Sequence, residues 1–197
     1  MARAMKKAAK KASTSKTKKK MIASRSAAKK IKKVVKKAKK ATKKVLAQPK
    51  GYYAVTPYLV VENASKAINF YKAGFGAKEV MCMNTPDGKV AHAELKIGDS
   101  KIMLGEECPQ KGTKSPTSLG GTPMSIYLYV KNVDAVMQSA VAAGATVIRE
   151  AQDMFYGDRS GGLQDPSGHQ WYVATHIEDV SPANMKKRAS ELYGSGK

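Results

Sequence analysis

His92 and Glu94 stand two positions apart in the stretch KVAHAELKI and form a candidate acid/base pair. The stretch alternates as a strand does, and residues two apart on a strand project from the same face. An imidazole beside a carboxylate could exchange protons with a bound molecule. A mutually satisfied pair on a solvated sheet would show the same pattern, so both interpretations stay open.

Hydroxyls, aromatic rings and one guanidinium could bind a ligand on the same sheet face. Tyrosines can stack on a flat molecule or donate hydrogen bonds, although they could equally fill a dimer interface. Arg159 joins this face if YGDRSGG keeps its alternation across the glycines. Its planar fork could bind a carboxylate or phosphate, and an ion pair with Asp158 or Asp153 is the alternative. The candidate ligand-binding residues are Thr56, Tyr58, Met103, Ser125, Tyr127, Arg159 and Tyr172.

The stretch DPSGHQWYVATH, residues 165–176, predicts a tight turn followed by a strand. Asp, Pro and Gly occupy positions that suit a type I turn. Alternation then places Trp171 and Val173 on the core side and Tyr172 on the other side. His169 directly follows the turn, and we expect it to be exposed.

These strands belong to an internal repeat. The segment TPYLVVENASKAINFYKAGFGAKEV, from Thr56, matches SIYLYVKNVDAVMQSAVAAGATVI, from Ser125. Each copy predicts a strand, a helix and three more strands, so the body is an α+β domain, residues 52–197, built from βαβββ units at 55–106 and 123–177. Ser181 as N-cap and Pro182 at the first helical position predict a final helix at 181–193.

The charge is concentrated at the N-terminus. Residues 1–50 contain 21 Lys and Arg and no Asp or Glu, whereas the remaining 15 basic residues match all 15 acidic ones. This Lys/Ala-rich composition cannot bury a core, so we predict a disordered basic tail at 1–51. From Ala27 onward, apolar residues recur every three or four positions, so this part could form an amphipathic helix on an anionic surface.

Composition also restricts the compartment. Cys82 and Cys108 are too few for a disulfide framework and lack metal-ligand spacing, which favours free thiols in a reducing compartment. There is no run of about 18 apolar residues and no apolar segment typical of a secretory signal, although a Lys-rich transit peptide stays possible. We expect a cytoplasmic protein, and association with the nucleoid stays open.

The body resembles the vicinal oxygen chelate superfamily, which includes glyoxalase I, bleomycin-resistance proteins and extradiol dioxygenases. The segments TPYLVVENASKAINFYKAGFGAKE, AHAELKIGDSKIML and FYGDRSGGLQDPSGHQWYVATHIEDVSP are similar to its PhnB-like branch. The resemblance covers roughly residues 54–190 and implies two units that form a curved mixed sheet around a small-molecule cavity, often in a homodimer. The tail composition resembles that of linker histones and of some bacterial nucleoid proteins.

The resemblance also implies where a metal would be held. Metal-dependent members carry His or Glu at positions that correspond here to Thr56, Met103, Ser125 and Tyr172. Neutral hydroxyls and a thioether are poor ligands for a catalytic divalent ion, so we expect no metal and no cofactor.

Three functions are compatible with this sequence. The first is metal-independent binding of a small organic molecule. The second is a lyase or isomerase that acts on a small carbonyl or phosphonate compound through His92, Glu94 or Arg159, or through a metal bound in a noncanonical way. The third is nucleic-acid binding by the tail, for which a solubilising extension or a membrane-surface contact is the alternative.

Overall fold

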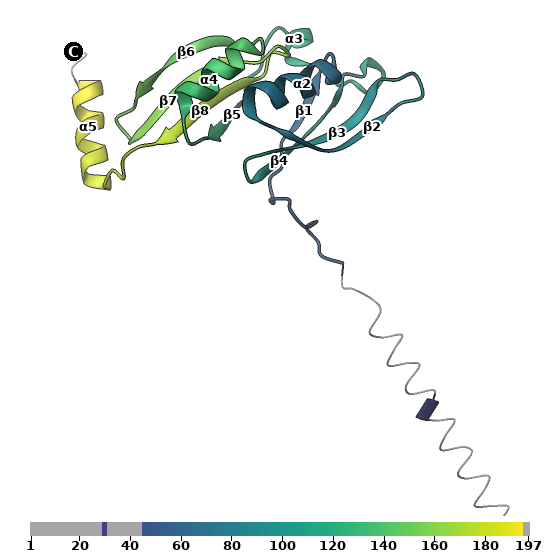
Figure 1. The fold of residues 1–197 in the computed structure, drawn as a ribbon. Helices are drawn as coiled ribbons and strands as arrows, with labels where there is room; N and C mark the ends of the chain where they lie inside the picture. Colours follow the sequence, from purple (N-terminus) through teal and green to yellow (C-terminus); the bar gives the residue numbers. More distant parts are fainter. Residues whose placement is uncertain (1–28, 31–44, 195–197) are drawn as a thin grey trace, which may run out of the picture. The chain divides into compact units, whose positions relative to one another are not determined.

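The computed structural model describes residues 29–30 and 45–194, and the chain from Gln48 onward forms a compact unit (Figure 1). The predicted tail, 1–51, lies outside the described residues except for 29–30 and 45–51. The first repeat comprises β1 (Tyr58–Val61), α2 (Ala64–Phe75), β2 (Lys78–Asn84), β3 (Val90–Ile97) and β4 (Ser100–Glu106). The second comprises β5 (Ser125–Tyr129), α4 (Val133–Ala142), β6 (Thr146–Asp153), β7 (Asp158–Gln164) and β8 (Gln170–His176).

The predicted α+β architecture of two βαβββ units is confirmed. Each unit forms its own four-stranded mixed sheet, with strand orders β1-β4-β3-β2 and β5-β8-β7-β6. In both sheets the first strand lies parallel to the last, and the register pairs Tyr58 with Met103 and Tyr127 with Tyr172. These pairs are related by the same offset along the chain, so the sequence repeat is also a repeat of register.

Asparagine begins the main helix of each repeat. The side chain of Asn63 accepts a hydrogen bond of 2.9 Å from the amide of Lys66, and Asn132 accepts one of 3.0 Å from the amide of Ala135. Such N-caps satisfy amides that have no partner within the helix. Because both asparagines follow a short strand directly, the chain turns from strand to helix at the same point in each repeat.

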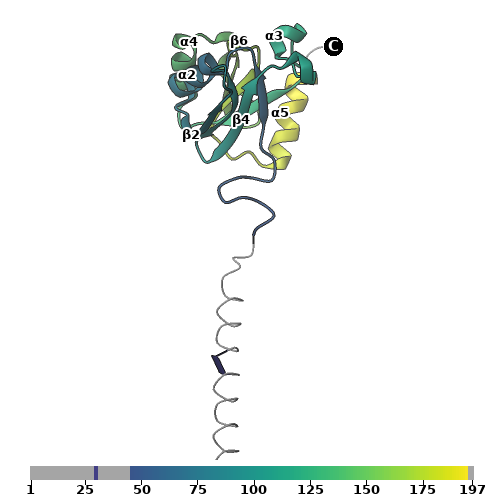
Figure 2. The same cartoon turned by 90° about the vertical axis from the view of Figure 1, so that its right-hand side faces the viewer.

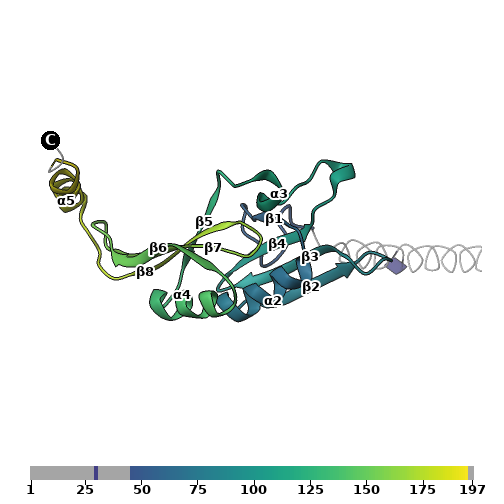
Figure 3. The same cartoon turned by 90° about the horizontal axis from the view of Figure 1, so that it is seen from above.

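Helices α2 and α4 lie side by side against one face of the two sheets, as Figures 1 and 3 show and as the end-on view of Figure 2 repeats. Gly74 permits the close approach, because a Cβ there would lie 3.0 Å from the Cα of Ala140. The sheet face under these helices, here called the helix face, is apolar and carries Trp171 and Val173, as predicted. Its members include Leu59, Val61, Ala93, Leu95, Ile102, Leu104, Leu163, Trp171 and Val173, all buried.

Asp165 connects the turn after β7 to the core through hydrogen bonds. The Asp165 carboxylate accepts hydrogen bonds from the Tyr71 hydroxyl at 2.6 Å and the Trp171 indole at 3.0 Å, and from the amides of Ser167 and His169.

The prediction that His169 is exposed is wrong. Its side chain is buried, with Nε2 2.9 Å from the carbonyl oxygen of Val60 in the first repeat.

Helices also occur between the two repeats and after the second one. The connection between the repeats contains the 3-10 helix η1 (Pro109–Lys111) and α3 (Pro116–Leu119), and α5 (Pro182–Gly194) follows the second repeat. Arg188 of α5 pairs with Glu178 at 2.7 Å and donates to the carbonyl oxygen of Phe155. Within the described part of the chain, no helix is long and apolar enough to span a membrane.

Candidate functional site

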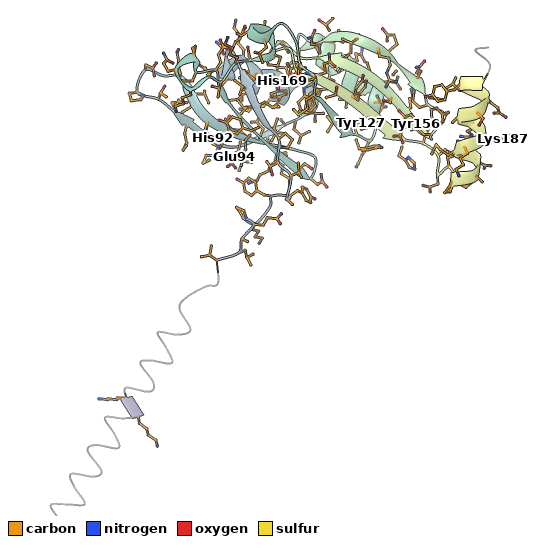
Figure 4. The ribbon with its side chains drawn as sticks, turned by 180° about the vertical axis from the view of Figure 1, so that it is seen from behind. His92, Glu94, Tyr127, Tyr156, His169 and Lys187 are labelled. Carbon is orange, nitrogen blue, oxygen red and sulfur yellow. The ribbon has the colours of Figure 1, made fainter. Side chains whose placement is uncertain are left out.

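The sheet face opposite the helices, here called the open face, carries most of the predicted site residues. On the first repeat the strands align Tyr58 beside Met103, Met103 beside Glu94, and Glu94 beside Met81. The Tyr58 ring also stacks on His92, with ring centres 5.8 Å apart. His92 and Glu94 lie together on this sheet, as predicted from their spacing (Figure 4).

Glu94 is buried and surrounded by donors. Its carboxylate accepts a hydrogen bond from the Tyr52 hydroxyl, lies 3.4 Å from the Lys101 ammonium, and lies 3.6 Å from Nε2 of His92. The hydrogen bond from Tyr52, aided by the charge of Lys101, holds the pKa of Glu94 below its usual value although burial opposes this. At neutral pH Glu94 is therefore a carboxylate held by a phenol and an ammonium.

Tyr52 was not foreseen from the sequence. It precedes β1, and its ring lies under the Lys101 ammonium, 3.7 Å from nitrogen to ring centre. No local spacing connects residue 52 with residue 94, because the contact joins positions 42 apart in the chain. The segment before β1 is thus part of the open face of the first repeat.

A cavity of about 600 Å³ adjoins this face at Tyr58 and Val60. Its other walls come from the β2–β3 turn and from residues 106–113, which begin the connection between the repeats. This volume falls within the range of small-molecule pockets. The lining mixes apolar strand residues with charged groups, including Lys89, Glu106 and Lys111.

The open face of the second repeat is aromatic. Tyr127 stacks on Tyr172 with ring centres 6.2 Å apart, and the guanidinium carbon of Arg149 lies 5.1 Å from the centre of the Tyr172 ring. Arg149 donates a hydrogen bond of 2.8 Å to the Ser160 hydroxyl, and the Tyr127 hydroxyl lies 3.4 Å from the same oxygen. Burial raises the pKa of Tyr127 to about 12, so its phenol stays protonated at neutral pH.

Asp158 lies beside this aromatic group and has its own partners. It is buried, accepts a hydrogen bond of 2.8 Å from Tyr129, and lies 2.7 Å from Nδ1 of His176. The contacts with Asp158 and then with Asp179 raise the pKa of His176. Asp158 is therefore bound by donors at both oxygens.

The placement of the remaining candidates is mixed. Ser125 lies on β5 with its hydroxyl 3.4 Å from the side-chain oxygen of Gln170, whereas Thr56 precedes β1 and donates to the carbonyl oxygen of Tyr53 at 3.1 Å. Arg159 does not join the others. It pairs in β7 with Thr175 rather than with Tyr172, so its side chain projects from the helix face.

Arg159 is instead an ion-pair residue. Its guanidinium binds Asp134 of α4 at 2.8 Å and Asp153 of β6 at 3.0 Å, and these hydrogen bonds raise its pKa. The alternation of β7 continues regularly through the glycines, and it places Gly162, Ser160 and Asp158 on the open face and Arg159 on the other. The ligand role assigned to Arg159 is corrected accordingly.

The four positions at which the resemblance implies metal ligands carry side chains that do not suit a divalent ion. Their donors are the hydroxyls of Thr56, Ser125 and Tyr172 and the thioether of Met103, which are poor ligands for such ions. In the described segments, 29–30 and 45–194, no group of three or more His, Cys, Asp or Glu side chains could hold a metal.

Two βαβββ repeats, each with its first strand parallel to its last, define a two-repeat α+β domain whose two main helices cover one sheet face. The chain belongs to the Glyoxalase/Bleomycin resistance protein/Dioxygenase superfamily, whose sequence profile matches residues 28–173. An uncharacterized protein of Mycobacterium bovis is 46% identical over 146 residues, which cover 73% of this chain and 94% of that protein. An uncharacterized protein of Mycobacterium tuberculosis is also 46% identical, and the match covers 84% of that protein.

Solved structures share the fold. The product of an Arabidopsis thaliana gene superposes with a TM-score of 0.52 at 27% identity, covering 62% of this chain and 98% of that one. A Bacillus cereus protein described as a putative 3-demethylubiquinone-9 3-methyltransferase, PhnB protein, superposes with a TM-score of 0.50 at 21% identity, covering 62% and 99%. The resemblance to PhnB-like proteins is confirmed at the level of the fold.

Proposed function

We propose that this protein binds a small organic molecule on the open faces of its repeats, without using a metal ion. The observation that carries the proposal is the group formed by Tyr127, Tyr172, Arg149 and Ser160, where stacked rings lie beside hydrogen-bond donors on an accessible sheet face. Aromatic walls with a few convergent polar groups are typical of ligand sites. Tyr127 keeps 43% of its surface exposed, so a ligand can reach it.

Binding of flat molecules tests this proposal. Chemical shift changes caused by 2-naphthamide, a neutral bicyclic probe, should map to the open faces, and Tyr127→Ala should weaken the interaction. The matched control is Tyr193→Ala, which removes a tyrosine that is 73% exposed on α5. Equal effects of the two substitutions, or shift changes confined to α5, would contradict the proposal.

A second copy of the chain is expected to pack on the open face of the first repeat in a homodimer. Large apolar side chains remain exposed there, among them Tyr58 and Met83, each at 50%. Exposed apolar surface of this kind favours association. Met83→Glu should therefore shift the protein toward monomer in sedimentation velocity, whereas Val141→Glu on α4 should not. A monomeric wild-type protein at micromolar concentration would refute the homodimer.

The enzymatic alternative is a lyase or isomerase that uses Glu94 as a base beside His92. Its support is the lowered pKa of the buried Glu94, which keeps the group ionised. Its difficulty is that Tyr52 and Lys101 already bind this carboxylate, so a substrate would have to displace them. Glyoxalase activity toward the glutathione adduct of methylglyoxal, lost in Glu94→Gln, would favour this function.

The N-terminal segment is proposed to bind polyanions, with nucleic acid as the first candidate. The support is its charge, since 21 Lys and Arg stand in residues 1–50 without one acidic residue. Such a segment attracts phosphates without reading bases. A cytoplasmic and nucleoid-associated location would follow if DNA is the partner.

A further inference from the structure

A β-bulge turns Arg149 onto the open face of the second repeat. In β6, Val147 pairs with Leu163 and Arg149 with Gly162, so one extra residue, Ile148, is inserted between them. Simple alternation would have placed Arg149 with Val147 on the helix face. The inserted residue reverses this, because a bulge re-aims the side chains that follow it.

Gly162 leaves room for the Arg149 side chain to extend over β7 toward the Tyr172 ring on β8. It lies between Arg149 and Tyr172 in the strand register and carries no side chain. A Cβ at this position would lie 3.0 Å from Ile148 and 3.3 Å from the Tyr172 ring. Any larger residue would therefore fill the space between the guanidinium and the ring.

The positive charge of Arg149 has no neutralising partner in the described part of the chain. Its hydrogen bonds go to the neutral Ser160 hydroxyl and the Met154 sulfur, and its buried Nε has no acceptor. The two other arginines in residues 45–194 behave differently, since Arg159 binds two aspartates and Arg188 binds Glu178. A guanidinium cannot lose its proton, and a partly buried charge without a counter-ion is costly.

The surroundings favour an external anion over an internal one. The carboxylate of Asp158, which lies on this face, is already bound by Tyr129 and His176. Ser160 holds one nitrogen of the Arg149 fork, and the Tyr172 ring supports its plane. The fork is thus fixed beside two stacked rings, the arrangement that suits a planar or bidentate anion.

We propose that Arg149 is the anchor for an acidic group, a carboxylate or a phosphonate, carried on the flat ligand of the second open face. This inference rests on the proposed ligand-binding function and specifies its ligand class. Arg149 would bind the acid group while the Tyr127 and Tyr172 rings contact the planar body. Ser160 acts as a positioning residue that keeps the fork in place.

Paired probes of one shape test this inference on the full chain at 150 mM salt. Titrations with 2-naphthoate, 2-naphthylphosphonate and neutral 2-naphthamide should show that Arg149→Gln weakens both anions by about tenfold or more but leaves the amide within about twofold. Arg149→Lys should lose part of the anion affinity, since it keeps the charge and loses the fork. The matched control is Arg159→Gln, which removes the same charge from the opposite face and should change none of the titrations.

The outcomes separate the two proposals. Binding of all three probes with equal losses in Arg149→Gln would refute the anion anchor and keep the ligand site. No binding of any probe by the folded wild-type chain would refute both. A shift in oligomeric state in Arg149→Lys and Arg149→Gln, with anion binding unchanged, would show that a carboxylate of a second copy neutralises Arg149, which also overturns the inference. Thermal melting of each variant confirms that the folded protein is being compared.

Discussion

The hydroxyl of Tyr52 donates a hydrogen bond to the carboxylate of Glu94 and so joins the segment before β1 to the open face of the first repeat. The same carboxylate lies 3.4 Å from Lys101, whose ammonium sits over the Tyr52 ring. Three side chains are therefore coupled, and a ligand or a conformational change that frees Glu94 must also release Tyr52.

Tyr52→Phe should raise the pKa of Glu94 toward its usual value, because the hydrogen bond from Tyr52 is the largest influence that lowers it. Because the pKa of Glu94 is lower in the folded protein, its ionised form stabilises the fold at pH values above the pKa that Glu94 has in the unfolded chain. This contribution is lost as the pH falls through the folded-state pKa. The variant should thus lose about 1 kcal/mol of unfolding free energy at neutral pH and unfold at a higher pH on acidification. Carboxyl NMR titration of Glu94 measures the shift directly.

Tyr53→Phe provides the control for this experiment. Tyr53 also donates to a carboxylate, that of Asp99 at 3.0 Å, but it lies on the exposed surface. Its substitution should leave the Glu94 titration unchanged. Identical Glu94 titrations in Tyr52→Phe and the wild type would mean that Lys101 alone sets the ionisation of Glu94.

Replacing Asp165 should be the most damaging single-atom change in the turn before β8. Asp165→Asn exchanges one carboxylate oxygen for an amino group, which would face two donors: either the Tyr71 hydroxyl and the Trp171 indole, or the amides of Ser167 and His169. Because these donors are buried, the free energy of unfolding should fall by about 2–4 kcal/mol in urea denaturation. Asp153→Asn, at an exposed ion pair, should cost less than about 1 kcal/mol. Similar losses in the two variants would contradict the role assigned to Asp165.

The fold could be predicted from the sequence because equivalent residues of the two repeats pair in the same strand register. Leu59 and Leu128, or Asn63 and Asn132, recur with their neighbours at one spacing, and alternation then separates core from open face on every regular strand. His169 could not be placed in this way. Its burial comes from a contact with Val60 in the other repeat, and no local pattern encodes such a contact.

Arg149 reaches the open face because of a bulge in β6, whereas the regular register of β7 places Arg159 on the helix face. Alternation identifies faces only while each residue on one strand opposes one residue on the next, and the bulge at Ile148 breaks that rule. The sequence around it, TVIREAQD, contains no glycine or proline to reveal the irregularity. Local residue patterns cannot predict a site residue that depends on an irregular backbone, such as Arg149, or on a partner distant in sequence, such as Tyr52.

Protein purified without added metal should contain far less than one equivalent of Zn, Ni, Fe or Mn, and chelators should leave its melting temperature unchanged. The reason is the weak donor set of Thr56, Met103, Ser125 and Tyr172. Elemental analysis by mass spectrometry measures the content. As a positive control, the double substitution Ser125→His and Tyr172→Glu should increase nickel uptake. Stoichiometric metal that is lost in Met103→Leu or Tyr172→Phe would overturn the prediction.

Duplex DNA affinity should reside in the N-terminal segment and fall steeply with salt. Truncation to residues 48–197 removes every Lys and Arg of residues 1–50 except Lys50, so it should abolish a mobility shift that the full chain produces at low salt. The logarithm of the association constant should fall with the logarithm of salt at a slope near −0.9 per phosphate neutralised. With about six lysines engaged, affinity should drop roughly a thousandfold between 50 and 200 mM salt.

Two comparisons decide whether nucleic acid is the partner of this segment. Duplexes of unrelated sequence should bind equally, since Lys contacts to phosphate carry no base information. Anionic vesicles should compete, because a lysine near such a surface gains about 1 kcal/mol, and the salt at which each complex dissociates then ranks the two polyanions. Circular dichroism of the 48–197 protein establishes that it is folded. If that folded protein shifts DNA as strongly as the full chain, or if the full chain ignores DNA at 50 mM salt, the basic segment is not a nucleic-acid-binding element.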